Sequence, residues 1–121
     1  MKEPVVFIVN TTKGTVIAQK GAIADTFSSR MIGLLNRRSL LPDEALVITR
    51  CKSIHMLFMR FPIDAIFVDK NNFVVGLIER IRPFRFSRIF FKASQVIEIP
   101  PGSIVQSRTA LGDKIDITTG Q

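Results

Sequence analysis

The sequence predicts a single α+β domain that is mostly antiparallel β-sheet, with about eight short strands curled into a barrel-like sheet and one amphipathic helix packed on it. Two observations predict this class. Short runs of apolar and β-branched residues recur along the chain, separated by Gly, Pro, Asn and Asp. Only residues 26–38 place their apolar side chains at helical spacing. A length of 121 residues fits one domain, so we assign residues 1–121 to a single unit.

The first half of the chain contains a predicted hairpin, the helix and a third strand. Residues 5–9 and 15–18 flank a five-residue turn, which is within the range of hairpin loops. Residues 26–38 carry one apolar stripe at positions i, i+4, i+7 and i+8, formed by Phe27, Met31, Leu34 and Leu35. A turn then leads to a β-branched strand over residues 45–49.

The second half is predicted to consist of strands. The long apolar stretch over residues 51–69 contains Pro62, which lacks a ladder donor and should divide the stretch into two strands or mark a bend. Further strands are predicted at residues 73–79, 93–99 and 114–118, with a short pairing segment at 104–106.

Composition and charge narrow the class of protein. A hydrophobic content of 46% excludes a disordered chain, and a single Cys excludes an internal disulfide. A formal net charge of +7 favours an anionic partner. The first apolar run has five residues, which is too short for a signal peptide, and no run reaches the roughly 18 residues of a membrane helix. We therefore expect a basic cytoplasmic protein.

The single His and Cys raise the question of a metal site. Cys51, His55 and Met59 recur every four residues, and on a helix they would share a face suited to a soft metal. On a strand, four residues span roughly 13 Å, too far for two ligands of one ion. Blue-copper and structural zinc sites also need more His or Cys ligands than this chain has. We predict no metal and no cofactor.

Asp64 interrupts an apolar run and is expected to be partly buried. A buried carboxylate needs hydrogen-bond donors or a cation, and Arg30 and Arg60 are candidates. The favoured alternative is that Asp64 supports the bend at Pro62. For His55, the favoured interpretation is a partly buried ring whose nitrogens bond to its neighbours.

We predict a non-catalytic ligand-binding or interaction module with a groove around His55 and Asp64. A small anionic ligand is expected, because two arginines outnumber one carboxylate. The candidate lining residues are Arg30, Ser53, His55, Met59, Arg60 and Asp64. The alternative is a hydrolase-type enzyme in which His55 is the base and Asp64 orients it.

A second candidate surface is the basic–aromatic segment, residues 80–92, which contains no acidic residue. Its cations are Arg80, Arg82, Arg85, Arg88 and Lys92, and they interleave with Phe84, Phe86, Phe90 and Phe91. Arginine neutralises phosphates and Phe stacks on bases, which suits single-stranded nucleic acid. An anionic membrane surface with inserted rings is equally consistent. The favoured alternative is a surface loop whose Phe side chains pack inward beneath the Arg stems.

Six pieces of the sequence together resemble the family called domain of unknown function 192, in its Ser-Ile-His branch. They are residues 30–35 (RMIGLL), 53–55 (SIH), 59–64 (MRFPID), 67–69 (FVD), 96–102 (VIEIPPG) and 112–115 (GDKI). The resemblance covers about residues 21–117. It implies a small, mostly β domain with one helix on a barrel-like sheet, and it implies no reaction. Residues 80–92 match none of the family's motifs, so a role for them is particular to this protein.

Overall fold

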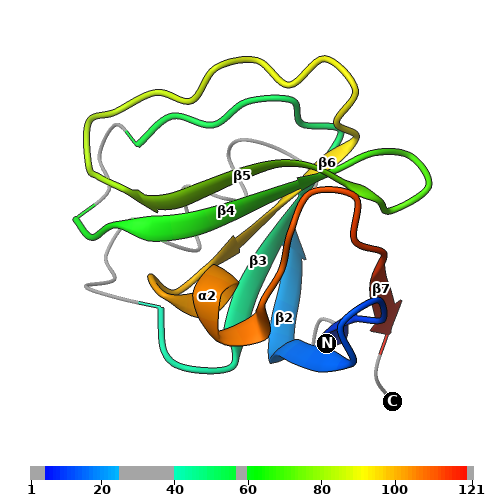
Figure 1. Cartoon of the computed structure of the whole chain (residues 1–121). Helices are drawn as coiled ribbons and strands as arrows, with labels where there is room; N and C mark the ends of the chain where they lie inside the picture. Colours follow the sequence, from blue (N-terminus) through cyan, green and yellow to red (C-terminus); the bar gives the residue numbers. More distant parts are fainter. Residues whose placement is uncertain (1–4, 25–39, 57–59, 120–121) are drawn as a thin grey trace.

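The computed structural model describes residues 5–24, 40–56 and 60–119, which form one curled sheet and a short helix (Figure 1). The sheet has seven strands in the order β5-β4-β6-β3-β2-β1-β7. The strands are β1 (Val6–Asn10), β2 (Thr15–Ala24), β3 (Glu44–Thr49), β4 (Ile63–Val68), β5 (Val74–Ile81), β6 (Gln95–Ile99) and β7 (Ile115–Thr119). The helix, α2, is Ser103–Ser107, and no helix in the described ranges has the length and apolarity needed to cross a bilayer.

The predicted fold class is confirmed, and two predicted elements need correction. Neighbouring strands are antiparallel except β2 and β3, which are parallel. Among the described residues of the stretch 51–69, only β4 belongs to the sheet, and residues 51–56 pair with a later segment instead. Residues 104–106 belong to α2, because Gly102, at a φ of 93°, turns the chain out of the sheet. The helix predicted over residues 26–38 lies outside the described residues.

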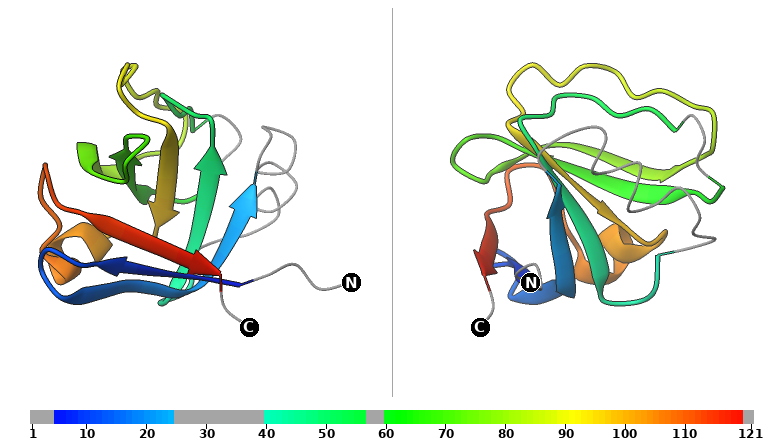
Figure 2. Two further views of the ribbon diagram at one scale, coloured as in Figure 1. Left: turned by 90° about the vertical axis from the view of Figure 1, so that its right-hand side faces the viewer. Right: turned by 180° about the vertical axis from the view of Figure 1, so that it is seen from behind.

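The sheet curls into a half-barrel, and its two edge strands, β5 and β7, approach each other at one end. Phe73, just before β5, forms an isolated bridge with Lys114, just before β7. Next to this bridge, the Val74 amide donates to the Asp113 carbonyl and the Ile115 amide donates to the Asn72 carbonyl, both at 2.9 Å. Figure 2 shows how the direction of the strands changes across the sheet from one edge to the other.

Strand β4 is buried along its whole length. Alternate side chains enter two separate apolar clusters, since successive residues of a strand point to opposite faces. Ile66 and Val68 join the cluster on the concave face, where α2 contributes Ile104. Ile63, Ala65 and Phe67 join the cluster on the outer face.

Two extended segments, residues 51–56 and 82–94, cover that outer face. They run side by side as the green and yellow traces at the top of Figure 1. Backbone hydrogen bonds join them at several points: Met56 donates to Arg85 (2.7 Å), Phe84 to Met56 (2.8 Å) and Ser87 to Ile54 (2.9 Å). The covering layer is therefore fixed by backbone pairing although it is not a regular strand pair.

Phe90 anchors the second covering segment to the sheet. Its ring stacks on Phe67 with the centroids 4.2 Å apart. It also lies against the backbone of Gly76 in β5, where an added Cβ would come within 2.4 Å of the ring. The guanidinium of Arg88 covers the ring at 4.5 Å from its centroid. A glycine in the middle of β5 thus makes room for the anchor.

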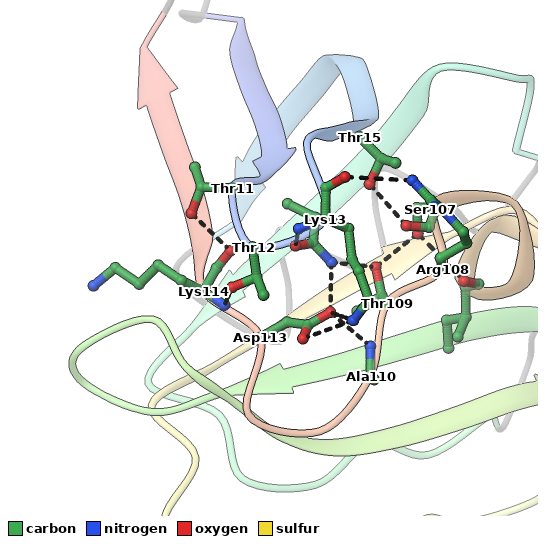
Figure 3. Close-up of polar contacts among 12 residues, drawn as sticks. Thr11, Thr12, Lys13, Thr15, Ser107, Arg108, Thr109, Ala110, Asp113 and Lys114 are labelled. Carbon is green, nitrogen blue, oxygen red and sulfur yellow. Dashed lines mark hydrogen bonds and ion pairs between the residues drawn. The ribbon is translucent and has the colours of Figure 1, made fainter.

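A buried polar cluster ties the β1–β2 turn to the loop between α2 and β7 (Figure 3). The Asn10 amide donates to Thr109 Oγ1 (3.1 Å) and to Asp113 Oδ2 (2.9 Å). Lys13 Nζ donates to both Asp113 oxygens and forms an ion pair at 2.9 Å. The Ala110 amide adds a bond at 2.9 Å. Asp113 is 4% exposed and well supplied with donors, so the cluster acts as a structural clamp.

The Asp113 clamp makes the stability of the protein sensitive to acid. The Asn10 amide, together with Lys13 and against the opposing effect of burial, lowers the pKa of Asp113 from 3.8 to about 2. Because the folded pKa lies below the unfolded one, this contribution is fully present above about pH 4 and is lost as the pH falls toward 2. We expect Asp113→Asn to lower the free energy of unfolding at neutral pH by about 1.5–3 kcal/mol. Urea unfolding from pH 7 to pH 2 measures this.

The matched control for Asp113 is Asp116→Asn, which removes an exposed carboxylate from β7. The difference in stability between wild type and Asp113→Asn should shrink below about pH 4, whereas Asp116→Asn should follow the wild type throughout. A difference that stays constant down to pH 2 would show that the Asp113 charge contributes nothing.

The Phe90 anchor leads to a second prediction. We expect Gly76→Ala to destabilise the protein by about 1–3 kcal/mol, because the new methyl group forces the Phe90 ring out of its place. The backbone amides of Ser87 and Phe90 should then exchange with solvent faster, while those of β1 and β7 keep their protection. Urea unfolding and hydrogen exchange provide the two measurements.

A double-mutant cycle with Phe90→Leu tests the cause. Shortening the ring should relieve part of the clash, so the combined variant should be more stable than the sum of the two single changes predicts. Strictly additive losses would mean that Gly76 does not accommodate Phe90.

Candidate functional site

Asp64 has a structural role at one end of the half-barrel. Its side chain is fully buried, and its Oδ1 accepts a hydrogen bond from the Arg80 amide at 2.9 Å. Its Oδ2 accepts from the amides of Gly102 (3.1 Å) and Ile104 (3.0 Å). Arg80 has a φ of 54°, so the carboxylate holds a left-handed bend in β5 as well as the first turn of α2. These donors are backbone groups, and neither Arg60 nor His55 is among them.

His55 lies in the first covering segment, on the far side of the sheet from Asp64. Its neighbours Ile54 and Met56 are buried in the outer cluster, and His55 itself forms a bridge with Phe86 and is half-buried. The two rings have centroids 6.4 Å apart. Asp64 has the same strand parity as Ile66 and therefore faces the concave side.

The described residues of the candidate groove therefore do not all lie together. Ser53 and Arg60 are exposed, while Arg30 and Met59 lie outside the described residues. The arrangement of a hydrolase with His55 oriented by Asp64 gains no support, because the sheet separates the two side chains. Ligand binding at this groove stays a prediction.

The basic–aromatic segment presents most of its rings to solvent. Phe84 is 66% exposed, Phe86 67% and Phe91 76%, whereas Phe90 is the buried anchor. The interpretation in which all four rings pack inward therefore holds only for Phe90. Exposed aromatic side chains in a cluster are uncommon on a protein surface and mark contact sites.

The cations of the segment are exposed alongside these rings. All five basic side chains are exposed to solvent: Arg80, Arg82, Arg85, Arg88 and Lys92. In the part of the chain that the structure describes, no acidic side chain forms an ion pair with Arg82, Arg85 or Lys92. Their charges are available to a partner. Arg88 also packs on Phe90, so it is held in a defined position.

Two hollows lie beside the segment, and both have cations in their walls. One, of about 260 Å³, is lined by Val75, Arg88, Phe90, Phe91 and Lys92. The second, also about 260 Å³, is lined by Arg50, Lys52, Ala93 and Ser94. Each is larger than the roughly 10–15 Å³ of such space that one water needs. The first combines apolar walls with two positive charges, which suits an anionic group attached to an apolar one.

Some residues that position this surface give little signal in the sequence. Lys52 Nζ donates to the carbonyls of Phe91 and Ala93, both at 2.8 Å, and so fixes the end of the segment. A single lysine in the sequence gives no indication that it forms such hydrogen bonds. Gly76 does carry a signal, because a glycine inside a strand often marks the close approach of another group.

Comparison with known proteins places the whole chain in one family. Residues 8–117 match DUF192, described as "Uncharacterized ACR". A UPF0127 protein of Thermococcus sibiricus is 40% identical over 117 residues, covering 90% of this chain and 73% of the relative. A UPF0127 protein of Pyrococcus furiosus is 34% identical over 115 residues, covering 90% and 96%.

Two crystal structures have a similar fold. A protein of unknown function from Novosphingobium aromaticivorans has a TM-score of 0.77 at 23% identity, covering 93% of this chain and 83% of its own. A Sinorhizobium meliloti protein, suggested to be a transcription regulator, has a TM-score of 0.75 at 21% identity, covering 95% and 93%. At these identities the likeness concerns the fold alone. The chain belongs to the uncharacterised DUF192 family, as its sequence motifs predicted.

Proposed function

We propose that this protein is a non-catalytic interaction module that binds a polyanionic partner through the basic–aromatic segment. The observation that supports this most directly is the exposure of Phe84, Phe86 and Phe91 on a segment whose backbone is paired with its neighbour at several points. Rings that served only the core would be buried like Phe90. Rings displayed beside unpaired cations suit a partner that offers both negative charge and apolar area.

The rigidity of the segment favours binding over a plain loop. A flexible loop loses conformational entropy when a partner orders it, whereas a pre-ordered segment avoids much of that cost. Here the amides of Phe84, Ser87 and Phe90 are bonded to the neighbouring segment, and Phe90 anchors the chain. The backbone that carries these side chains is therefore ordered before any partner arrives.

Heparin serves as a general polyanion with which to test the proposal. We expect wild-type protein to bind a fluorescently labelled heparin fragment with an affinity that falls steeply as salt rises, because binding releases counterions. Arg82→Gln/Arg85→Gln should weaken binding and reduce the slope of log affinity against log salt by about 2. Fluorescence anisotropy over a range of salt concentrations measures both quantities.

The matched control is Lys20→Gln/Lys70→Gln, which removes two exposed cations from other parts of the surface. Both double variants have the same net charge, so a nonspecific charge effect would alter them equally. Equal weakening by the two variants, or no binding by the wild type at low salt, would refute a role for the segment.

A further inference from the structure

We propose that the polyanionic partner is the surface of an anionic lipid bilayer, on which the protein sits peripherally with its aromatic side chains inserted. This inference rests on the function proposed above and names its partner. The residues that would enter the bilayer are Phe84, Phe86, Ile89 and Phe91, and the residues that would contact headgroups are Arg82, Arg85, Arg88 and Lys92.

The apolar part of the segment is suited to lipid. Besides the three exposed rings, Ile89 is 50% exposed within the same run of residues. A base stacks on an aromatic face, and an isoleucine offers no such face. Acyl chains, in contrast, accept aliphatic and aromatic side chains alike, since insertion depends on the apolar area removed from water.

Part of the backbone of the segment is already paired, which lowers the cost of approaching a bilayer. The amide of Phe84 donates to Met56, that of Ser87 to Ile54 and that of Phe90 to Lys52. An amide that left water without a partner would carry a desolvation penalty.

The cations are arranged for phosphate headgroups. Arg88 and Lys92 line the 260 Å³ hollow together with the apolar side chains of Val75 and Phe91. A hollow with charge and apolar wall together suits the boundary between a headgroup phosphate and the acyl chain attached to it. Proteins that bind single strands combine stacking rings with a charged groove along the backbone. Here the three exposed rings are Phe84, Phe86 and Phe91, with exposed fractions of 66%, 67% and 76%.

Vesicle binding tests the inference directly. The probes are vesicles of phosphatidylcholine and phosphatidylglycerol in equal amounts, and vesicles of phosphatidylcholine alone. We expect the wild type to sediment with the mixed vesicles at low salt and to remain in solution with the neutral ones. Phe84→Ser/Phe86→Ser should weaken partitioning by on the order of tenfold. Arg82→Gln/Arg85→Gln should weaken it by about 30-fold, because each cation contributes about 1 kcal/mol at an anionic surface.

The control for the rings is Val105→Ser/Leu111→Ser. These side chains are 64% and 66% exposed, close to the values for Phe84 and Phe86, and lie in α2 and in the loop after it. Loss of binding only in the Phe variant would assign insertion to the segment. Circular dichroism confirms that both variants are folded.

Heparin and a single-stranded oligothymidylate, tested in parallel, separate failure of this inference from failure of the proposed function. Segment-dependent binding to heparin without binding to mixed vesicles overturns the lipid partner and keeps the polyanion site. A third outcome is that binding to the oligonucleotide requires Phe84 and Phe86 whereas binding to vesicles does not. That outcome overturns the lipid partner in favour of nucleic acid. Absence of binding to all three probes overturns both proposals.

Discussion

The burial of β4 on both faces is the constraint on which the rest of the structure depends. One face lies on the concave side of the half-barrel, and the other would be exposed if nothing covered it. Residues 51–56 and 82–94 form that cover, and they stay in place because they pair with each other and because Phe90 is anchored on Gly76. The proposed contact surface is therefore the outside of a layer that the core requires.

This arrangement links the stability of the fold to the proposed binding at residues 80–92. Phe90 lies between Phe67 and the exposed part of the segment, so the packing that excludes water from the outer cluster also fixes the display of Phe84, Phe86 and Phe91. A segment whose backbone is already ordered loses less conformational entropy when a partner binds. If the proposed binding occurs, a change beneath the layer should alter it without touching the partner.

The sequence predicts most strands to within one or two residues, because alternating burial and turn residues are local signals. It fails where a distant contact decides the outcome. Residues 104–106 have the composition of a strand but lie in α2. Gly102 turns the chain there, and Asp64, about forty residues away, accepts hydrogen bonds from the amides of Gly102 and Ile104. The number of exposed rings is equally non-local. Four Phe residues lie in one segment, and the space above Gly76 takes only Phe90.

The placement of acidic residues explains why the segment, and not the net charge, determines the proposed function. The Asp64 carboxylate accepts hydrogen bonds from backbone amides, and the Asp69 carboxylate accepts them from amides of its own turn. Asp113 accepts hydrogen bonds from Asn10 and Lys13. Charges farther away than the Debye length, about 10 Å at 0.1 M salt, contribute little to what a partner experiences. A partner at residues 80–92 therefore responds to the local charge there, where five cations occur without an acid, and only weakly to the net charge of +7. The remaining selectivity must come from the apolar side chains between those cations, because charge alone attracts every polyanion alike.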